Sequence, residues 1–146
     1  MHPDIHINYI AILAAVVVNY IIGFLWYGPL FGKTWMAEMK IPADSKPAPG
    51  AMLRGSILMV IGSFLTAYVL AHDTQVWRAS VWHAGEDMAN WQYGFYAGFF
   101  VWLGFYVPMS LGGVAWENKS WKLFSLNVAY QFVSLQAVGA ILANLR

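Results

Sequence analysis

The chain has 146 residues, of which 60% are hydrophobic and only 10% are charged, whereas an ordinary soluble domain carries about 25% charged residues. Its formal net charge is +1 and its basic residues are scattered, so the sequence lacks the basic footprint of a nucleic-acid-binding protein. It has no cysteine, which excludes disulfide bonds, thiolate metal sites, iron–sulfur clusters and covalently attached c-type haem.

Four long segments contain no charged residue: 5–32, 55–72, 88–116 and 123–145. Each is close to or longer than the roughly 20 residues that a helix needs to cross the hydrocarbon core of a bilayer. The sequence therefore predicts an all-α fold, a bundle of four transmembrane helices that makes up a single integral membrane domain over residues 1–146.

The first helix is expected over residues 7–27, ending before Pro29, because proline has no amide hydrogen to donate and its ring clashes with the preceding turn. The residues before it lack the basic region of a cleavable signal peptide, so we expect this span to be retained. The loop that follows contains Pro42, Pro47, Pro49 and Gly50, a composition typical of a linker.

The second helix is expected over residues 52–71, and the loop after it has helical periodicity. Its apolar residues recur at spacings of three and four: Trp77, Val81, Ala84, Met88 and Trp91. This spacing predicts an amphipathic segment over residues 74–91 that rests on the outer membrane surface. Arg78, Glu86 and Asp87 lie mostly off its apolar face.

The third helix is expected over residues 91–113, with a kink near its end at Pro108, and the fourth over residues 121–145. The first and third helices share a loose sequence echo, because Tyr27-Gly28-Pro29 recurs as Tyr106-Val107-Pro108. Two tandem hairpins would produce such an echo, and so would chance, since prolines often end helices.

The distribution of Lys and Arg predicts the orientation of the chain. The loops after the first and third helices, with the ends that flank them, hold six of these residues: Lys33, Lys40, Lys46, Arg54, Lys119 and Lys122. The opposite side holds only Arg78 and Arg146. The positive-inside rule therefore places those two loops in the cytoplasm and both termini on the outer side.

Amide and hydroxyl side chains form polar faces on two of the predicted helices. Asn127, Gln131 and Ser134 stand at i, i+4 and i+7 of the fourth helix, and Asn19 lies on the first. Such groups need a protein partner or a wet cavity in hydrocarbon, so we expect the two faces to look toward each other or toward a cavity. Interhelical hydrogen bonding is the favoured interpretation and a polar path for a solute is the alternative, because no ionisable residue lies in mid-membrane.

Gln136 lies nine residues after Asn127, half a turn out of phase with the polar face. We expect it to point away from that face, where a second subunit or a partner protein would satisfy its amide. Gln136 is therefore a predicted subunit contact, and it predicts an oligomer or a component of a larger complex.

All four histidines fall on the predicted outer side, where a metal site is a weaker hypothesis. His83 and Glu86 have i, i+3 spacing, and His72 lies at the end of the second helix. Imidazoles and carboxylates gathered at one membrane face are ligands for Zn(II) or Cu(II). The sequence has no nucleophile with an evident base and no glycine-rich phosphate loop, so we expect no enzyme activity. The many Trp and Tyr residues are interpreted as interfacial anchors, so no cofactor is expected, and an aromatic box for a quinone, pigment or lipid is the alternative.

Two motifs resemble a known family. The stretch from Trp26 to Trp35, Trp-Tyr-Gly-Pro-Leu-Phe-Gly-Lys-Thr-Trp, is one, and the stretch from Leu126 to Gln131 continued through Gly139 to Leu142 is the other. Both resemble the signatures of a family of small bacterial and fungal membrane proteins that is catalogued only as a domain of unknown function. The resemblance covers nearly the whole chain and implies four spans without an established activity.

The leading hypothesis is a non-catalytic multi-pass protein of a bacterial inner membrane, which self-associates or serves as an accessory subunit of a larger membrane complex. The main alternative is a small transporter or channel, with a path lined by Asn19, Asn127, Gln131 and Ser134. A metal-binding protein of the outer face is the third. The lipid bilayer and a second copy or membrane partner are the partners expected, and nucleic acid is not.

Overall fold

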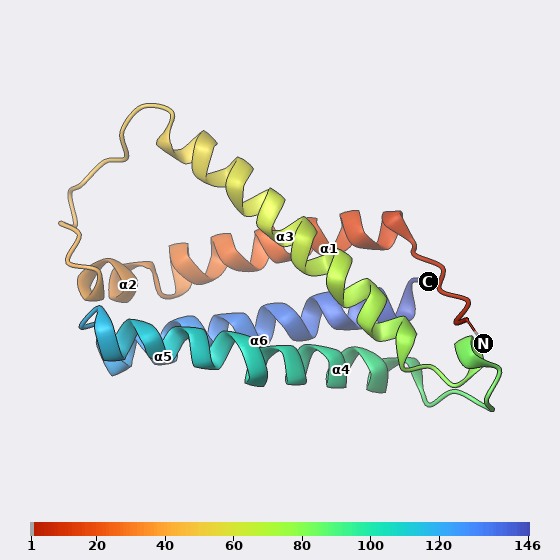
Figure 1. Ribbon diagram of the computed structural model, residues 1–146. Helices are drawn as coiled ribbons and strands as arrows, with labels where there is room; N and C mark the ends of the chain where they lie inside the picture. The colour runs from red at the N-terminus through yellow and green to blue at the C-terminus, as the bar shows by residue number, and fades with distance from the viewer. Residues whose placement is uncertain (1) are drawn as a thin grey trace.

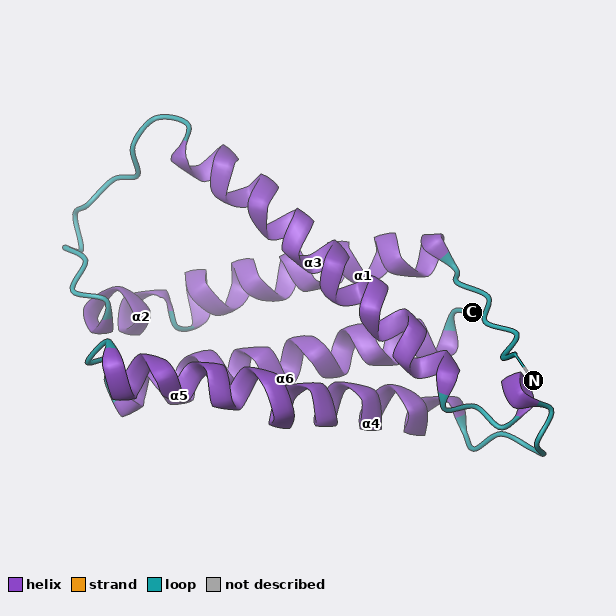
Figure 2. Cartoon of the chain, viewed as in Figure 1, coloured by secondary structure: helices purple, strands orange, loops and turns teal. Residues whose placement is uncertain are grey.

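In the computed structural model, which describes residues 2–146, every regular element is a helix (Figures 1 and 2). Four helical stretches are long and apolar enough to cross a membrane: Tyr9–Leu30, Ala51–Val76, Asn90–Trp116 and Trp121–Asn144. The predicted all-α class with four membrane helices is therefore confirmed. The chain runs back and forth, so that both termini lie at one end of the bundle (Figure 1).

The first span contains a π-turn that the sequence did not predict. Helix α1 (Tyr9–Leu25) begins after Asn8, whose side-chain oxygen accepts hydrogen bonds from two amides of the first turn. It continues into the π-turn η1 (Trp26–Leu30), and helix α2 (Gly32–Glu38) follows. The predicted stop before Pro29 is wrong, because the bond from the Phe31 amide to the Trp26 carbonyl closes a wider turn that accommodates a residue without an amide hydrogen.

Helix α3 (Ala51–Val76) runs five residues beyond the predicted end at residue 71. Its second half carries a buried stripe that faces the bundle: Ser63, Ala67, Leu70, Ala71, Thr74 and Gln75. Its first half diverges from the other helices (Figure 1). From Ala51 to Gly62 every residue is exposed except Ser56, which is half-buried. One side-chain hydrogen bond ties this first half to the bundle, between Ser56 Oγ and the Tyr20 hydroxyl of α1 at 2.8 Å. Helix α3 is therefore held mainly by its second half.

The connection between α3 and α4 is not the amphipathic segment predicted over residues 74–91. Residues 74–76 end α3, and the only helical turn that follows before Asn90 is the 3-10 turn η2 (Ser80–Trp82). Two positive backbone angles interrupt any longer helix here, φ +54° at His83 and φ +137° at Gly85. The connection is instead a folded loop.

The third span is built from α4 (Asn90–Val101), a second π-turn η3 (Trp102–Tyr106) and α5 (Val107–Trp116). The irregular turn thus lies in the middle of the span, before Pro108, whereas a kink was predicted near the end of the helix. Each π-turn starts with Trp and has Gly at its third position, Trp26 and Gly28 in η1, Trp102 and Gly104 in η3. The two π-turns therefore align on Trp-x-Gly, three residues away from the alignment given by the Tyr-x-Pro match.

Helix α6 (Trp121–Asn144) is the centre of the bundle and contacts α1, α3, α4 and α5. It packs most closely on α4, where Gly94 and Gly139 lie back to back and leave no room for a Cβ on either. The apolar core lies toward the end that holds the termini and includes Ile12, Leu70 and Leu135. The opposite end is tied by Glu38 of α2, which accepts a hydrogen bond from Ser120 Oγ and pairs with Lys122.

Candidate functional site

A polar cluster joins three helices inside the membrane-spanning part of the bundle. Asn19 of α1 donates from Nδ2 to Ser63 Oγ of α3 at 2.6 Å, and its side-chain oxygen accepts a hydrogen bond from Ser134 Oγ of α6. Ser63 and Ser134 are both buried. The amide and the two hydroxyls therefore satisfy one another, as groups in hydrocarbon must.

A second polar contact lies toward the α2 end of the bundle, where η1 places Tyr27. The Tyr27 hydroxyl donates to Asn127 Oδ1 of α6 at 2.8 Å. The Tyr27 ring meets the ring of Tyr130 edge to face, with centroids 4.9 Å apart. Tyr130 fits over Gly23, where an added Cβ would lie 3.0 Å from its hydroxyl. Together with the Asn19 cluster, these contacts form a column of paired polar side chains along α6.

The structure pairs two of the four residues predicted for the polar face, because Asn19 and Ser134 are bonded directly. Asn127 bonds instead to Tyr27 of η1. Gln131 is half-buried and makes no side-chain hydrogen bond with the described residues. Because the other three bond to side chains of other elements, their geometry favours interhelical bonding. A solute path along these residues stays a prediction.

Gln136 does not need a second subunit to satisfy its amide. It points away from the Asn127 face, as expected, but the surface it meets belongs to its own chain. Its Nε2 donates to the Phe95 carbonyl of α4 at 3.4 Å, and a Cβ added at Gly98 would lie 3.0 Å from the same atom. This bond lies within the chain and does not require a second subunit, so the subunit contact at Gln136 stays a prediction.

The three residues predicted as metal ligands lie apart from one another. His72 Nδ1 is 2.8 Å from the Tyr68 carbonyl on α3, and His83 Nε2 is 3.0 Å from Asp4 Oδ2. Glu86 is exposed in the loop. Within residues 2–146 no group of three His, Cys, Asp or Glu side chains could hold a metal ion. The predicted outer-face metal site is therefore not formed there.

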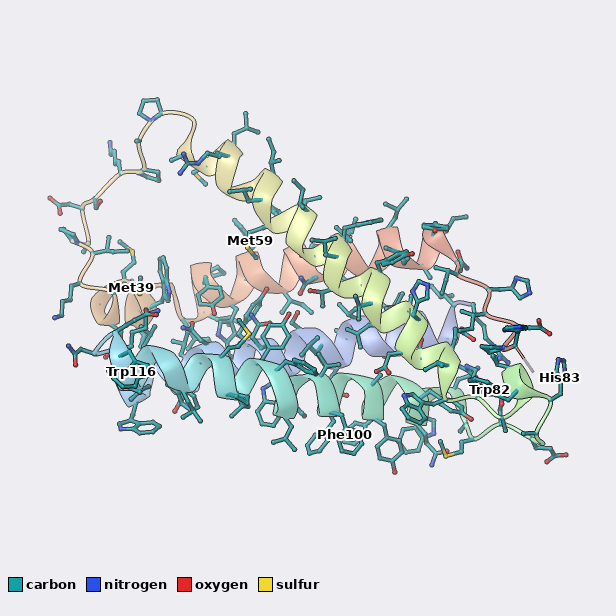
Figure 3. The ribbon with its side chains drawn as sticks, in the orientation of Figure 1. Met39, Met59, Trp82, His83, Phe100 and Trp116 are labelled. Atoms are coloured by element: carbon teal, nitrogen blue, oxygen red, sulfur yellow. The ribbon has the colours of Figure 1, made fainter. Side chains whose placement is uncertain are left out.

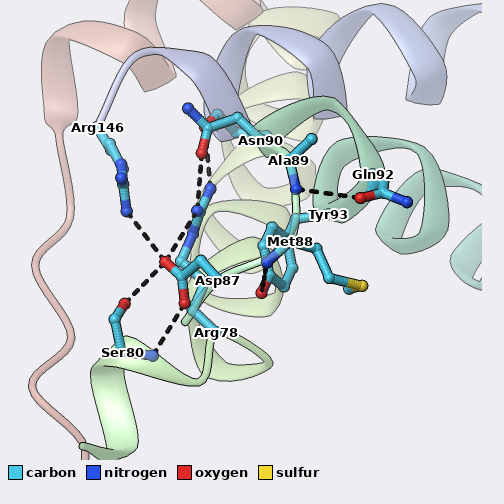
Figure 4. A network of polar contacts seen from close by, with 10 residues as sticks. Arg78, Ser80, Asp87, Met88, Ala89, Asn90, Gln92, Tyr93 and Arg146 are labelled. Carbon is cyan, nitrogen blue, oxygen red and sulfur yellow. Dashed lines mark hydrogen bonds and ion pairs between the residues drawn. The ribbon is translucent and has the colours of Figure 1, made fainter. Parts of the chain in front are cut away.

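The burial of Arg78, the most buried charge in the protein, was not predicted from the sequence. Arg78 was expected on the polar side of an amphipathic segment, yet its exposed fraction is 0%. Its guanidinium donates from Nη1 to Asn90 Oδ1 at 2.9 Å (Figure 4). It also donates from Nη2 to the Ala143 carbonyl at 3.0 Å. Its central carbon lies 4.4 Å from the centroid of the Tyr93 ring. Arg78 thus joins the loop to the start of α4 and the end of α6.

Asp87 completes this network and links it to the C-terminal residue. Its carboxylate lies 3.5 Å from Arg78 Nη1 and 3.6 Å from Arg146 Nη1. It also accepts hydrogen bonds from the backbone amide and the hydroxyl of Ser80, at 2.9 and 2.8 Å. We name Arg78, Ser80, Asp87, Asn90 and Arg146 the end clamp, because they fasten one end of the bundle.

The end clamp perturbs the pKa of both its central groups. Burial lowers the pKa of Arg78, the nearby Arg146 lowers it further, and Asp87 opposes this shift. Burial raises the pKa of Asp87, but the hydrogen bonds from Ser80 and the charge of Arg78 outweigh it, so that the pKa lies below its ordinary value. The guanidinium groups of Arg78 and Arg146 therefore share the carboxylate of Asp87.

Two grooves border these sites. One, of about 270 Å³, opens near the loop between α5 and α6 and reaches Tyr106, Ser110 and Asn127. The other, of about 480 Å³, is almost wholly apolar and runs along the last turn of α3 and the exposed side of α4. The first reaches one end of the polar column, and the second lies at the membrane-facing surface.

The comparisons with known proteins identify a family but no activity. The model of a family described as "Protein of unknown function (DUF1761)" matches residues 10–143, most of the chain. The chain therefore belongs to this family. No curated protein and no solved structure matches the chain.

Proposed function

We propose that this member of the family is a non-catalytic multi-pass membrane protein that associates with itself in the bilayer through the first half of α3. The four apolar helices make it a membrane protein, and self-association is our inference from how those helices pack. We further propose a bacterial inner membrane, with both termini on the outer side, supported by the excess of Lys and Arg in the two loops at the opposite end.

The exposed first half of α3, which meets its own chain in one side-chain hydrogen bond, from Ser56 to Tyr20, is the observation that carries the proposal. Within α3, Gly55 and Gly62 share a face seven residues apart, and an added Cβ at either would meet nothing within 4 Å. In contrast, Gly94 and Gly139 already pack against each other where α4 meets α6, and neither has room for a Cβ. Small residues let transmembrane helices approach closely, and such contacts drive helix association in lipid.

The contents of the bundle interior support a non-catalytic role. Amides and hydroxyls there are engaged with one another, as in the Asn19 cluster and the pair of Tyr27 and Asn127. Paired in this way, they stabilise helix contacts. An accessory subunit would use the same α3 surface to bind a different chain, so the experiment must report which chain occupies it.

Cysteine crosslinking tests the proposal cleanly because the native sequence has no cysteine. Met59, between the two free glycines, is 49% exposed, and Met109 on α5 is 78% exposed. In native membranes we expect Met59→Cys to give disulfide-linked dimers and Met109→Cys to give few. Equal yields from both variants, or crosslinks of Met59→Cys to another protein alone, would overturn self-association through α3.

A steric variant gives an independent readout. Gly62→Phe adds a ring where a single copy has open space, so the monomer should fold while the contact between copies is blocked. Gly112→Phe is the matched control, since Gly112 also has nothing within 4 Å. We expect native mass spectrometry to show dimers for the control and monomers for Gly62→Phe. Dimers in both would contradict the proposed surface.

The orientation has its own test. Lys46→Cys lies in the proline-rich loop and Ala84→Cys in the loop between α3 and α4. We expect a membrane-impermeant maleimide to label Ala84→Cys in intact cells and Lys46→Cys only after lysis. The reverse pattern would invert the proposed topology.

A further inference from the structure

The apolar groove beside α4 has the shape and position of a lipid-binding surface. Its lining includes Trp77 after α3 and Tyr96, Phe100 and Phe105 along α4 and η3, all of them exposed. Figure 3 shows Phe100 directed away from the other helices. Because these residues lie in or next to the membrane-spanning stretches, the groove opens toward lipid.

The length of the groove matches one leaflet. Tyr93 and Phe105, which both line it, are twelve positions apart on nearly continuous helix, or about 18 Å at 1.5 Å per residue. Half of the hydrocarbon core of a bilayer is about 15 Å. The groove thus extends from the level of the first turn of α4 to about the middle of the membrane.

The end of the groove beside the last turn of α3, called here its upper end, carries a single charge. Among the described residues that line it, Asp73 is the only charged one. Trp77 donates from Nε1 to Asp73 Oδ1 at 3.0 Å. The nearest buried cation, Arg78, lies against the Tyr93 ring with an exposed fraction of 0%, so it is not open to a ligand in the groove.

A carboxylate beside an exposed indole is suited to a cationic group. A carboxylate accepts charge-assisted hydrogen bonds from an ammonium, and the face of a Trp ring attracts a cation. An anionic headgroup would instead meet the repulsion of Asp73. The carboxylate at the upper end of the groove favours a cationic headgroup, and the apolar lining along the rest of it favours an acyl chain. Together they fit an amphiphile that carries both.

We propose that this groove binds one phospholipid whose headgroup carries a primary ammonium, as in phosphatidylethanolamine. The ammonium pairs with Asp73 beside Trp77, and one acyl chain lies along Tyr96, Phe100 and Phe105. This site is separate from the first half of α3, so it stands or falls independently of self-association.

Native mass spectrometry tests the proposal on the full chain in detergent with an equimolar mixture of phosphatidylethanolamine and phosphatidylglycerol of identical acyl chains. We expect the ethanolamine lipid to occupy the protein roughly three- to tenfold more than the glycerol lipid, as one hydrogen bond of ordinary net strength predicts. Asp73→Asn should bring this ratio to about one. Asp44→Asn, which removes a carboxylate in the opposite loop, should leave the ratio unchanged.

Two further arms separate the headgroup from the acyl contact. Phe100→Ala should lower occupancy by both lipids without changing their ratio. Phosphatidylcholine should bind more weakly than phosphatidylethanolamine, because its trimethylammonium has no hydrogen to donate. Absence of preference in the native protein, an unchanged preference in Asp73→Asn, or equal binding of the choline and ethanolamine lipids would overturn the proposal. Trp77→Leu keeps the carboxylate and should weaken the preference, which provides a second variant should Asp73→Asn fold poorly.

Discussion

Replacing Arg78 with methionine should destabilise the fold by about 2–3 kcal/mol. The change removes the two hydrogen bonds to Asn90 and to the Ala143 carbonyl, at 2.9 and 3.0 Å. Each bond from a charged group contributes about 1.5–3 kcal/mol, and the contact with the Tyr93 ring adds about 2 kcal/mol when desolvated.

Two opposing terms reduce that sum. The guanidinium loses its hydration on burial, and its Nε is buried without a hydrogen-bond partner in the described chain, which costs about 1–3 kcal/mol. Removing one partner of a buried ion pair typically costs about 3–5 kcal/mol. Here Asp87 keeps its bonds from Ser80 and its pairing with Arg146, so the loss should fall below that range.

The free energy of unfolding can be measured by denaturant titration in mixed micelles, followed by circular dichroism. Arg54→Met is the matched control, because Arg54 is exposed at the start of α3 and its loss should change stability by less than about 0.5 kcal/mol. Arg78→Lys should recover only part of the loss, since a single ammonium cannot reproduce the fork that reaches Asn90 and Ala143. The same free energy of unfolding for Arg78→Met and Arg54→Met would refute the stabilising role of Arg78 in the end clamp. A free energy of unfolding for Arg78→Lys equal to that of the native protein would refute the role of the guanidinium fork.

Three further predictions use other contacts. Gly94→Ala should destabilise the fold by about 1–3 kcal/mol by overpacking, because its Cβ would strike the Gly139 backbone. Gly62→Ala should be neutral or gain up to about 1 kcal/mol from helix propensity. Similar unfolding midpoints for the two variants would contradict this packing. Asn19→Leu should cost about 1–3 kcal/mol in the same titration, since two interhelical bonds disappear, and a gain in stability would show that the cluster is dispensable. Because the pKa of Asp87 is lowered in the folded protein, the stability that Asp87 contributes is present above the ordinary aspartate pKa and is lost as the pH falls through the lower folded pKa. Asp87→Asn should therefore flatten the acid dependence of the free energy of unfolding. An unchanged dependence on pH in Asp87→Asn would rule out this contribution.

The sequence predicted the four membrane helices because hydrocarbon excludes charge, and uncharged windows mark where the chain can enter it. It placed the end of α3 too early because Thr74 and Gln75 are polar residues that are buried against the bundle, a fact that hydropathy does not contain. Likewise, Pro29 taken alone indicates the end of a helix. In the structure Pro29 lies inside the π-turn η1, whose wider hydrogen bonding does not need its amide hydrogen.

The burial of Arg78 could not be predicted from local pattern. Its partners lie 12 and 65 positions further along the chain, at Asn90 and Ala143. The periodicity of the loop suggested a helix because Trp77, Val81 and Met88 fall at helical spacing, but the ring of contacts around Asp87 stabilises a closed loop instead. Helical spacing of the amides, in contrast, sufficed to put Asn19 and Ser134 on facing surfaces, because both lie within uninterrupted stretches of helix.

The uneven attachment of α3 leaves a short stretch at its start free to rotate. The attachment nearest this start is the hydrogen bond between Ser56 and the Tyr20 hydroxyl of α1, and the stretch from Ser56 to Ala51 spans five positions, or about 7.5 Å. A rotation of about 10° at Ser56 displaces the tip by about 1.3 Å, while the end clamp keeps the opposite extremity fixed. The proline-rich linker joined to the tip contains no helix or strand, so it sets no rigid element against such a rotation.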